Sequence, residues 1–547
     1  MISKICVENR NINSVHASNP NKKTERQNPS FGCAGLWPVI LKGIQECEKN
    51  PMINVAVIDM LSAILPRTFV ESLTNWFAGF EAFRRESSGL IVNCLIPSGI
   101  AWTAAKGLNF MMPKNTKMYN CWADSKLIQK ATELYTESQS TDKVHDALKE
   151  ILSNIEGYHG RGKDSSVVVK NILSPQEIEQ CASELKELTL SDKNGKELKK
   201  AIQAIREKII EKTHVYENIT VGGKGTKVNA STVDTLLQDT VKFFQQYRKA
   251  GSEISISEFA QKSKNLIKSK SILGMAIVLP LAASMQYINR WITKKVSGVE
   301  GAPIYEDFGN EQNEEIKQKS KEGLLKQKII SISSMIGVGL LSMMKMPKWN
   351  MFEFKGPLPT MDQARVISTT TFASRMAVAD DKNELAEATV RDIATFASLY
   401  FLGDYAAKGA ATIIEKKTGV ELLNETKKLD KNANFIQKFW HWMKDVHIKS
   451  SEEVVSKTKE LLKGAKPNTE QEKTIAKELK KAINLRSACQ AANLGVSLLL
   501  LGLVIPIFTR KSTKKNHAED LKIAQEHLSS TNNSTPTGQP TLKPQTV

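Results

Sequence analysis

Residues 487–509 read SACQAANLGVSLLLLGLVIPIFT, and no charged residue interrupts this run between Arg486 and Arg510. As an α-helix it would be about 34 Å long, which is enough to cross a bilayer core of about 30 Å. The basic sequence RKSTKK follows, and its cations suit an anionic headgroup layer. The run therefore predicts a transmembrane helix over residues 487–509. The same layout, an apolar run between basic residues, recurs earlier in the chain.

Two earlier runs predict a transmembrane helical hairpin over residues 271–345. Residues 271–289 (SILGMAIVLPLAASMQYIN) are uncharged, and Pro280 in their middle is tolerated better in a membrane-spanning helix than in a soluble one. Residues 329–344 (IISISSMIGVGLLSMM) are slightly short for a crossing, but their small residues allow close helix contact.

Residues 31–112 form an apolar region rich in Trp and Phe, for which we expect helices that span a membrane or lie at its interface. Residues 87–105 are just long enough to cross, and the sequence also allows them to pack in a protein interior or to lie in the interface. Residues 54–65 (NVAVIDMLSAIL) are too short to cross and carry Asp59, so we expect a buried or interfacial helix there. The aromatic residues of 76–83 share one helical face, as in an interfacial helix or a core helix.

Residues 113–270 have a different character. Their apolar residues recur at spacings of three and four with Lys and Glu between them, which predicts a soluble, lysine-rich helical domain. Ser174, Pro175 and Glu177 form a helix-start signal, and Thr232 before Val233 resembles another. Glycine clusters at 157–162 and 222–225 predict loops.

Residues 346–486 are expected to form a further helical region, which contains the Ala-, Ser- and Thr-rich segment 360–425. Arg391, Asp392 and Asp404 interrupt an otherwise apolar stretch of it. If this stretch crosses a membrane, these charges would face a bundle interior or an aqueous cavity, which makes them candidate functional residues. The alternative is a buried helix of a bundle outside the membrane, with the charges near its ends.

Both ends of the chain are polar. Residues 1–30 lack the apolar core of a secretory signal, so we expect a disordered segment and no cleavable signal peptide. Residues 510–547 combine a basic juxtamembrane cluster with a Ser-, Thr-, Asn- and Pro-rich tail, which also predicts disorder. The seven cysteines are scattered and form no CxxC motif, as expected for reduced thiols.

No sequence motif identifies a reaction, cofactor or metal. Residues 157–163 match the phosphate-loop pattern GxxxxGK, but Asp164 replaces the required Ser or Thr, and a helical pattern precedes the match. His441, Asp445 and His447 come closest to a metal-binding set, yet at helical spacing His447 points away from the other two. The HExxH and GxSxG signatures are absent, so nothing favours an enzyme.

These patterns together predict an all-α protein with membrane-embedded helices, lysine-rich soluble helical domains and disordered termini. A net charge of +18 suits anionic headgroups, and nucleic acid is a weaker expectation because no Arg-rich or aromatic-interleaved pattern accompanies the lysines. We expect a multi-pass membrane protein with a structural or anchoring role, which contacts the lipid bilayer and, through its helical domains, other proteins. The alternatives are a transporter or pore that uses charges within 388–408, and a soluble basic helical binding protein. Orientation stays open because lysines flank both sides of the runs.

Overall fold

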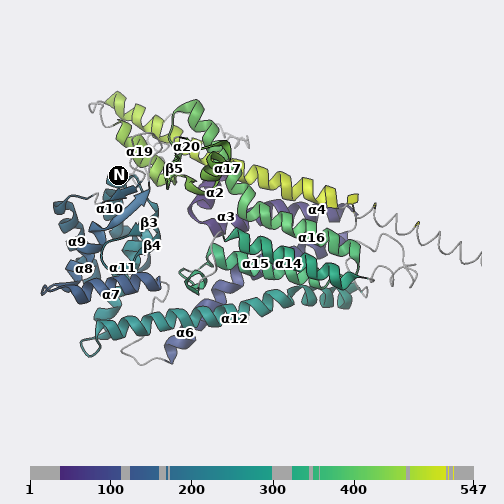
Figure 1. The fold of residues 1–547 in the computed structure, drawn as a ribbon, viewed down its shortest axis with the longest axis horizontal. Coiled ribbons are helices and arrows are strands. Elements are labelled where there is room, and N and C mark those ends of the chain that lie inside the picture. Colours follow the sequence, from purple (N-terminus) through teal and green to yellow (C-terminus); the bar gives the residue numbers. More distant parts are fainter. Residues whose placement is uncertain are drawn as a thin grey trace, which may run out of the picture. The chain divides into compact units, whose positions relative to one another are not determined.

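The computed structural model (Figure 1) is mostly helical, which confirms that part of the expected fold. It describes residues 37–74, 76–111, 124–158, 168–170, 173–297, 323–343, 349–356, 358–430, 432–462 and 469–509, together with residues 511, 512, 515 and 522. The chain divides into two units, residues 1–43 and 44–547. Helix α2 (Trp37–Lys49) begins in the first unit, and all other described elements belong to the second.

A sheet-containing domain occupies residues 124–255. Its helices are α7 (Ser125–Glu137), α8 (Lys143–Ser153), α9 (Pro175–Leu190), α10 (Gly195–Thr213) and α11 (Val233–Ala250). Its four-stranded antiparallel sheet has the order β2-β1-β3-β4, with strands β1 (Ile155–Tyr158), β2 (Val168–Lys170), β3 (Glu217–Val221) and β4 (Val228–Thr232). Apolar residues of these helices and strands form one core, and the sheet is an addition to the helical domain expected over residues 113–270.

Local signals in this domain are used as predicted. Ser174 caps α9 in a reciprocal capping box with Glu177, and Thr232 caps α11 by accepting a hydrogen bond from the backbone N–H of Thr235. Residues 222–225 lie in the loop 222–227 between β3 and β4, where Gly223 and Gly225 have positive φ angles that suit glycine.

A helical bundle is built from the apolar parts of the chain. Its elements are α3 (Pro51–Ile58), the π-helical turn η2 (Asp59–Ile64), α4 (Leu65–Thr74), α5 (Trp76–Leu90), the π-helical turn η3 (Ile91–Leu95), α6 (Ile96–Phe110), α12 (Ile256–Ser297), α14 (Leu324–Ser342), the 3₁₀ turn η6 (Trp349–Phe352), α15 (Met361–Ala377), α16 (Lys382–Ala397), the π-helical turn η7 (Ser398–Leu402) and α17 (Gly403–Thr418). Two adjoining clusters of buried apolar side chains hold these helices together. The contacts between α15 and both α12 and α14 place the small-residue-rich segment inside this bundle.

Helix α12 is a single helix of 42 residues that belongs to two cores. Phe259 and Ile267, in its first part, are buried in the core of the sheet-containing domain. Val278 and Ala282, further along, are buried in the core of the bundle. The helix therefore runs without interruption through residues 270 and 271, where the sequence changes from lysine-rich to apolar.

A C-terminal unit follows α17. It contains β5 (Leu423–Glu425), α18 (Phe435–Asp445), β6 (Val446–Ile448), α19 (Ser451–Leu462) and α20 (Thr469–Leu499), and α20 continues through the π-helical turn η8 (Leu500–Val504). Strands β5 and β6 pair antiparallel, with Asn424 opposite His447. A small core that includes Ala411, Leu423 and Cys489 joins this unit to α17.

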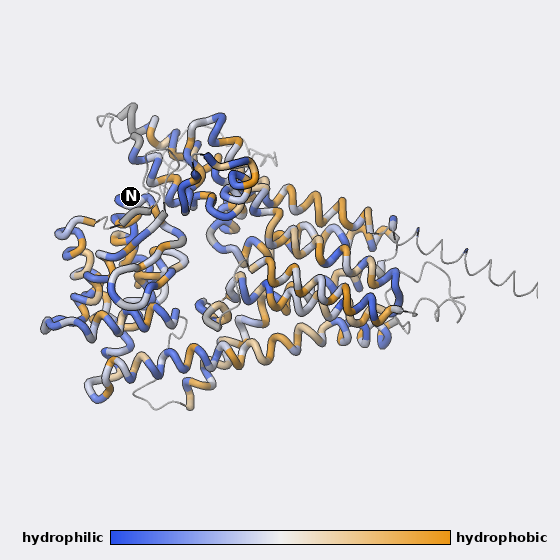
Figure 2. The backbone as a smooth tube through the Cα atoms, in the orientation of Figure 1, coloured by the Kyte–Doolittle hydropathy of each residue, from blue (hydrophilic) through white to orange (hydrophobic). Residues whose placement is uncertain are grey.

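Among the described residues, five helices are long and apolar enough to cross a membrane by length and composition. They are Pro51–Leu73, Gly79–Phe110, Ile256–Val296, Leu324–Ser342 and Lys473–Thr509. Only 17% to 33% of the residues in their most apolar stretches are buried, and Figure 2 shows the hydrophobic colour along these helices. The expectation that residues 54–65 are too short to cross is wrong, because the helix continues past Pro66 to Leu73.

Three of the π-helical turns in the described chain are followed by a proline at the same spacing. Pro66, Pro97 and Pro506 each stand two residues after the last residue of η2, η3 and η8. A proline ring clashes with the carbonyl four residues earlier and lacks an N–H, so a widened turn before it allows the helix to continue. Gly502 of η8 lies close to η2, since a methyl group on it would be 3.3 Å from the Ser62 carbonyl oxygen.

Candidate functional site: buried ion pairs in the bundle

A chain of buried ion pairs connects four helices of the bundle. Arg67 of α4 pairs with Glu86 of α5, with 3.2 Å between Nη1 and Oε2. Arg375 of α15 contacts the same Glu86 oxygen at 3.7 Å and pairs through Nη1 with Oδ1 of Asp392 of α16 at 2.8 Å. The two carboxylates and two guanidinium groups therefore alternate across the helix interfaces.

Arg391 extends this network along α16. Its Nε lies 3.2 Å from Asp392 Oδ1, and its Nη1 lies 3.6 Å from Glu387 Oε1. The six side chains of the network are 1% to 12% exposed and carry three positive and three negative charges. Burial of ions costs solvation free energy, which alternation of opposite charges offsets only while every partner is present.

The network keeps some unused hydrogen-bonding capacity. Within the described residues, Asp392 Oδ2 and the Nε atoms of Arg67 and Arg375 have no hydrogen-bond partner. Buried polar atoms of this kind are normally satisfied by protein or by ordered water. The site thus offers one acceptor and two donors to water or to a small polar ligand.

Further polar contacts lie beside the network and place it near one end of the bundle. Arg84 of α5 donates through Nη2 to Thr293 Oγ1 at 2.9 Å, and Asn289 Nδ2 donates to Ser88 Oγ at 2.9 Å. Arg290 pairs with Asp380 and Glu384. Thr293 and Arg375 stand four and two residues before the ends of their helices, α12 and α15. Water and headgroups reach charges near helix ends more easily than charges at a bundle centre.

The structure separates the three candidate residues. Arg391 and Asp392 belong to the buried network, whereas Asp404 is an exposed residue near the start of α17 that accepts a hydrogen bond from Asn493 Nδ2 at 3.3 Å. Sequence reasoning missed Arg67, Glu86 and Arg375. The available signal was their position, since each is a charged residue inside or beside an apolar helix.

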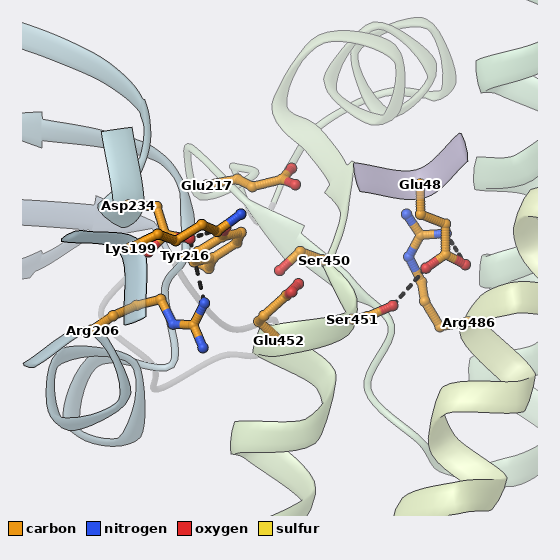
Figure 3. Close-up of a pocket in the computed structure, with 10 residues that line it drawn as sticks. All are labelled: Glu48, Lys199, Arg206, Tyr216, Glu217, Asp234, Ser450, Ser451, Glu452 and Arg486. Carbon is orange, nitrogen blue, oxygen red and sulfur yellow. Dashed lines mark hydrogen bonds and ion pairs between the residues drawn. The ribbon is translucent and has the colours of Figure 1, made fainter. Parts of the chain in front are cut away.

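A second polar site lies where the sheet-containing domain meets the C-terminal unit. A cavity of about 250 Å³ is lined there by side chains of both charges, which Figure 3 draws as sticks: Glu48, Lys199, Arg206, Tyr216, Glu217, Asp234, Ser450, Ser451, Glu452 and Arg486. Asp234 Oδ2 accepts a hydrogen bond from the Tyr216 hydroxyl at 3.1 Å and pairs with Arg206 Nη1 at 3.3 Å. These contacts fix two charged groups, Arg206 and Asp234, on the wall formed by the sheet-containing domain.

Glu453 connects the two walls of this junction. Its carboxylate is buried and accepts hydrogen bonds from the backbone N–H groups of Tyr216 at 2.8 Å, Glu217 at 3.2 Å and Ser450 at 2.9 Å. Asn424 Nδ2 adds a fourth at 3.2 Å. Burial, with a smaller contribution from the Glu453 charge, raises the pKa of Glu217 to about 7. The Glu453 contacts attach the C-terminal unit to the sheet-containing domain. Among the residues of this junction, no nucleophile is paired with a base.

The weaker motifs do not assemble into sites. His441 Nε2 lies 2.7 Å from the Lys427 carbonyl oxygen, while His447 is exposed on β6 rather than on α18 with His441 and Asp445. Within the ranges that the structure describes, no three His, Cys, Asp or Glu side chains converge as metal ligands. Residues 159–164 of the phosphate-loop match lie outside the described residues.

The glycine loop between β3 and β4 is occupied by contacts from α7. Lys130 donates through Nζ to the carbonyl oxygens of Gly222 (2.9 Å) and Lys224, and Glu133 Oε2 accepts from the backbone N–H of Thr226 at 2.7 Å. A phosphate cradle needs N–H groups that point at the ligand, so this loop is a structural turn. Cys47, Cys94, Cys181 and Cys489 are free and buried, and the other three cysteines lie outside the described residues.

Fold and site together define a class: a helical protein with apolar helices exposed on the outside and ion pairs buried between them. Comparison with protein-family models, with curated proteins and with solved structures finds no match to this chain. Its function has to be inferred from its own residues.

Proposed function

We propose that this chain is an integral membrane protein with a structural or anchoring role. Its apolar helices would cross the bilayer and hold the sheet-containing domain and the C-terminal unit at the membrane surface. The observation that carries this proposal is the distribution of side chains on the bundle, where large apolar groups are exposed and charged groups lie between the helices.

The exposed apolar side chains extend over all five apolar helices. Examples with more than half of their surface exposed are Phe69, Leu95, Trp291, Ile329, Leu341, Leu503 and Ile507. Soluble monomers rarely expose contiguous apolar patches larger than a few hundred Å². Lipid tails would cover such a surface without competing for hydrogen bonds, since every backbone group in a helix is already paired.

The path of the chain is consistent with this arrangement. His214, the C-cap residue of α10, contacts Ser456 of α19, with 2.9 Å between Nδ1 and Oγ, and the Glu453 contacts join the same two parts. Both parts must therefore lie on one side of a membrane, which requires an even number of crossings between them. Helices α12 and α14 would supply two such crossings, and they contain the two runs for which the sequence predicts a transmembrane hairpin over residues 271–345.

Alkaline carbonate extraction of membranes that contain the full chain tests the proposal. An integral protein stays in the pellet, and protease treatment of sealed vesicles then leaves protected fragments that include α12 and α14. A matched variant, in which exposed Leu498, Leu499 and Leu503 become Ser, should lose protection of the α20 fragment alone. Recovery of the wild-type chain in the carbonate supernatant would contradict membrane integration and favour a soluble helical protein.

A second candidate function is a pathway for an ion or a polar solute. It is favoured by one observation, the unpartnered Asp392 Oδ2 and arginine Nε atoms in the buried network. Reconstituted vesicles test it: Asp392→Asn and Arg391→Gln should change ion flux at equal protein abundance, while Asp404→Asn, outside the network, serves as control. Equal flux through all variants and protein-free vesicles would remove this candidate.

A further inference from the structure

Helix α18 presents an apolar face whose side chains are about half or more exposed. Phe435, Ile436, Phe439 and Trp440 are 82%, 64%, 48% and 51% exposed, and none of the helix residues is buried. At about 100° per residue these four side chains lie on one side of the helix. Asn434 caps the helix in a reciprocal capping box with Gln437, which stabilises its first turn.

The C-terminal half of α18 is fixed to α17 through Trp442, which at about 100° per residue borders the apolar face on the Phe435 side. The Trp442 ring stacks on Tyr405, with 6.0 Å between ring centroids, and its Nε1 donates to Thr412 Oγ1 at 3.2 Å. Lys408 Nζ donates to the carbonyl oxygens of Trp442 at 2.9 Å and Met443 at 3.1 Å. These contacts hold α18 against α17 and leave Phe435, Ile436, Phe439 and Trp440 largely exposed.

Contacts between α17 and α20 give the level of α18 along the bundle. Gly403 of α17 lies against Asn493 and Ser497 of α20. Further along α17, Ala411 belongs to the same buried cluster as Cys489 of α20. Tyr405, Lys408 and Thr412, which hold α18, therefore stand beside the first residues of the charge-free run that begins after Arg486. This is the level at which α20 would enter the lipid.

The charges around α18 match an anionic surface. Lys438 and Lys444 flank the apolar face on its two sides, and Lys444 Nζ lies 5.4 Å from the centroid of the Trp440 ring. Residues 426–445 contain five lysines and two aspartates. Aromatic rings with neighbouring lysines are typical of the boundary between headgroups and acyl chains.

We propose that α18 is an interfacial helix that lies on the bilayer surface. Phe435, Ile436, Phe439 and Trp440 insert at the boundary between headgroups and acyl chains, and Lys438 and Lys444 contact anionic headgroups. This inference rests on the proposed membrane integration of the bundle and adds a second type of lipid contact to it.

Photo-crosslinking in the full-length protein tests the inference. p-Benzoylphenylalanine is introduced in place of Phe439, of Gln437 on the polar face of α18, or of Leu503 in α20. Each variant is reconstituted in vesicles of equal parts phosphatidylcholine and phosphatidylglycerol, irradiated, and analysed by mass spectrometry for lipid adducts. We expect lipid adducts at positions 439 and 503 and several-fold fewer at 437.

The two membrane proposals fail in different ways. Lipid adducts at position 503 with no excess at position 439 over position 437 would overturn the interfacial helix and leave the membrane spans intact. Crosslinks from position 439 to a protein would also overturn the interfacial helix, and would indicate a protein partner for α18. Absence of lipid adducts at 503 would overturn both. As a second measurement, Lys438→Gln with Lys444→Gln should lower the adduct yield at 439 by about fivefold per lysine at low salt.

Discussion

Asp392 holds two arginines of the buried network at once, so its removal should be more harmful than removal of a whole pair. In Asp392→Leu, Arg375 and Arg391 keep their buried charges but lose this partner, and we expect the free energy of unfolding to fall by about 3–5 kcal/mol. In the double variant Arg375→Met with Asp392→Leu, most of this loss should be recovered because apolar groups replace the pair. Denaturant unfolding in detergent micelles measures both variants. A double variant less stable than Asp392→Leu would contradict this account.

Glu217 predicts a dependence of stability on pH at the junction of the sheet-containing domain and the C-terminal unit. Its pKa rises from 4.5 in the unfolded chain to about 7, so between these values the folded protein binds a proton that the unfolded chain releases. The free energy of unfolding should therefore fall as pH rises from about 4.5 to about 7, by at most about 3 kcal/mol. Thermal unfolding against pH measures this.

The control for this pH profile is Glu197→Gln on the exposed face of α10, which should leave the profile unchanged. Glu217→Gln should make it less steep, and the difference between the two profiles isolates the Glu217 carboxyl. A Glu217→Gln profile that still falls as steeply as the wild type would assign the dependence to other buried carboxyl groups.

The candidate site was only partly predictable at this scale. Arg391 and Asp392 were found because charges inside an apolar stretch are costly and therefore conspicuous. Arg375 lies far along the chain from Arg67 and Glu86, and only the packing of α4, α5 and α15 brings the three residues together. Asp404 carried the same signal as Asp392, but the residue itself is exposed and lies outside the network.

At the scale of elements, two glycines of α17 provide a matched pair. A methyl group on Gly403 would overlap Asn493 Oδ1 and lie 2.9 Å from its Cγ, whereas a methyl group on Gly409 meets nothing within 4 Å. We expect Gly403→Ala to destabilise the protein by about 1–3 kcal/mol through loss of the α17–α20 contact. Gly409→Ala should be neutral or stabilising by up to about 1 kcal/mol because alanine favours helix. Chemical unfolding in micelles distinguishes them, and equal effects would contradict the close approach.

Helices were predictable because their caps and apolar spacing are local, as at Ser174 and Thr232. The strands were missed because β1 to β4 are only three to five residues long and owe their pairing to partners elsewhere in the chain. The π-helical turns before Pro66, Pro97 and Pro506 were also missed. The prolines are visible in the sequence, but the sequence does not show that a π-helical turn before each proline would accommodate its ring.

At the scale of the whole molecule, the direct contacts between the sheet-containing domain and the C-terminal unit predict a topology. Protease sites inserted between α7 and α8 and between β5 and α18 should be cut from the same face of sealed vesicles. Matched insertions that leave the chain intact but are cut from opposite faces would require an odd number of crossings between them. Fragment sizes after one-sided protease treatment provide the measurement.

Hydropathy alone found four of the five apolar helices, and it underestimated the fifth because Asp59 and Pro66 interrupt Pro51–Leu73. Membrane crossing itself remains a proposal. The contacts of Glu453 with the backbone of Tyr216 and Glu217 could not be predicted, because no local sequence pattern relates α19 to β3.

The 42-residue helix α12 has a practical consequence for anyone who dissects this protein. A fragment that stops at residue 255 would lack Phe259 and Ile267, which are buried in the core of the sheet-containing domain. The apolar core residues that these side chains cover would then be exposed and prone to aggregation. A usable soluble piece should retain the first turns of α12 through about residue 270 and end before Ile272. Because α12 is one continuous helix that belongs to both cores, a tilt of the sheet-containing domain would move the part of α12 that packs in the bundle.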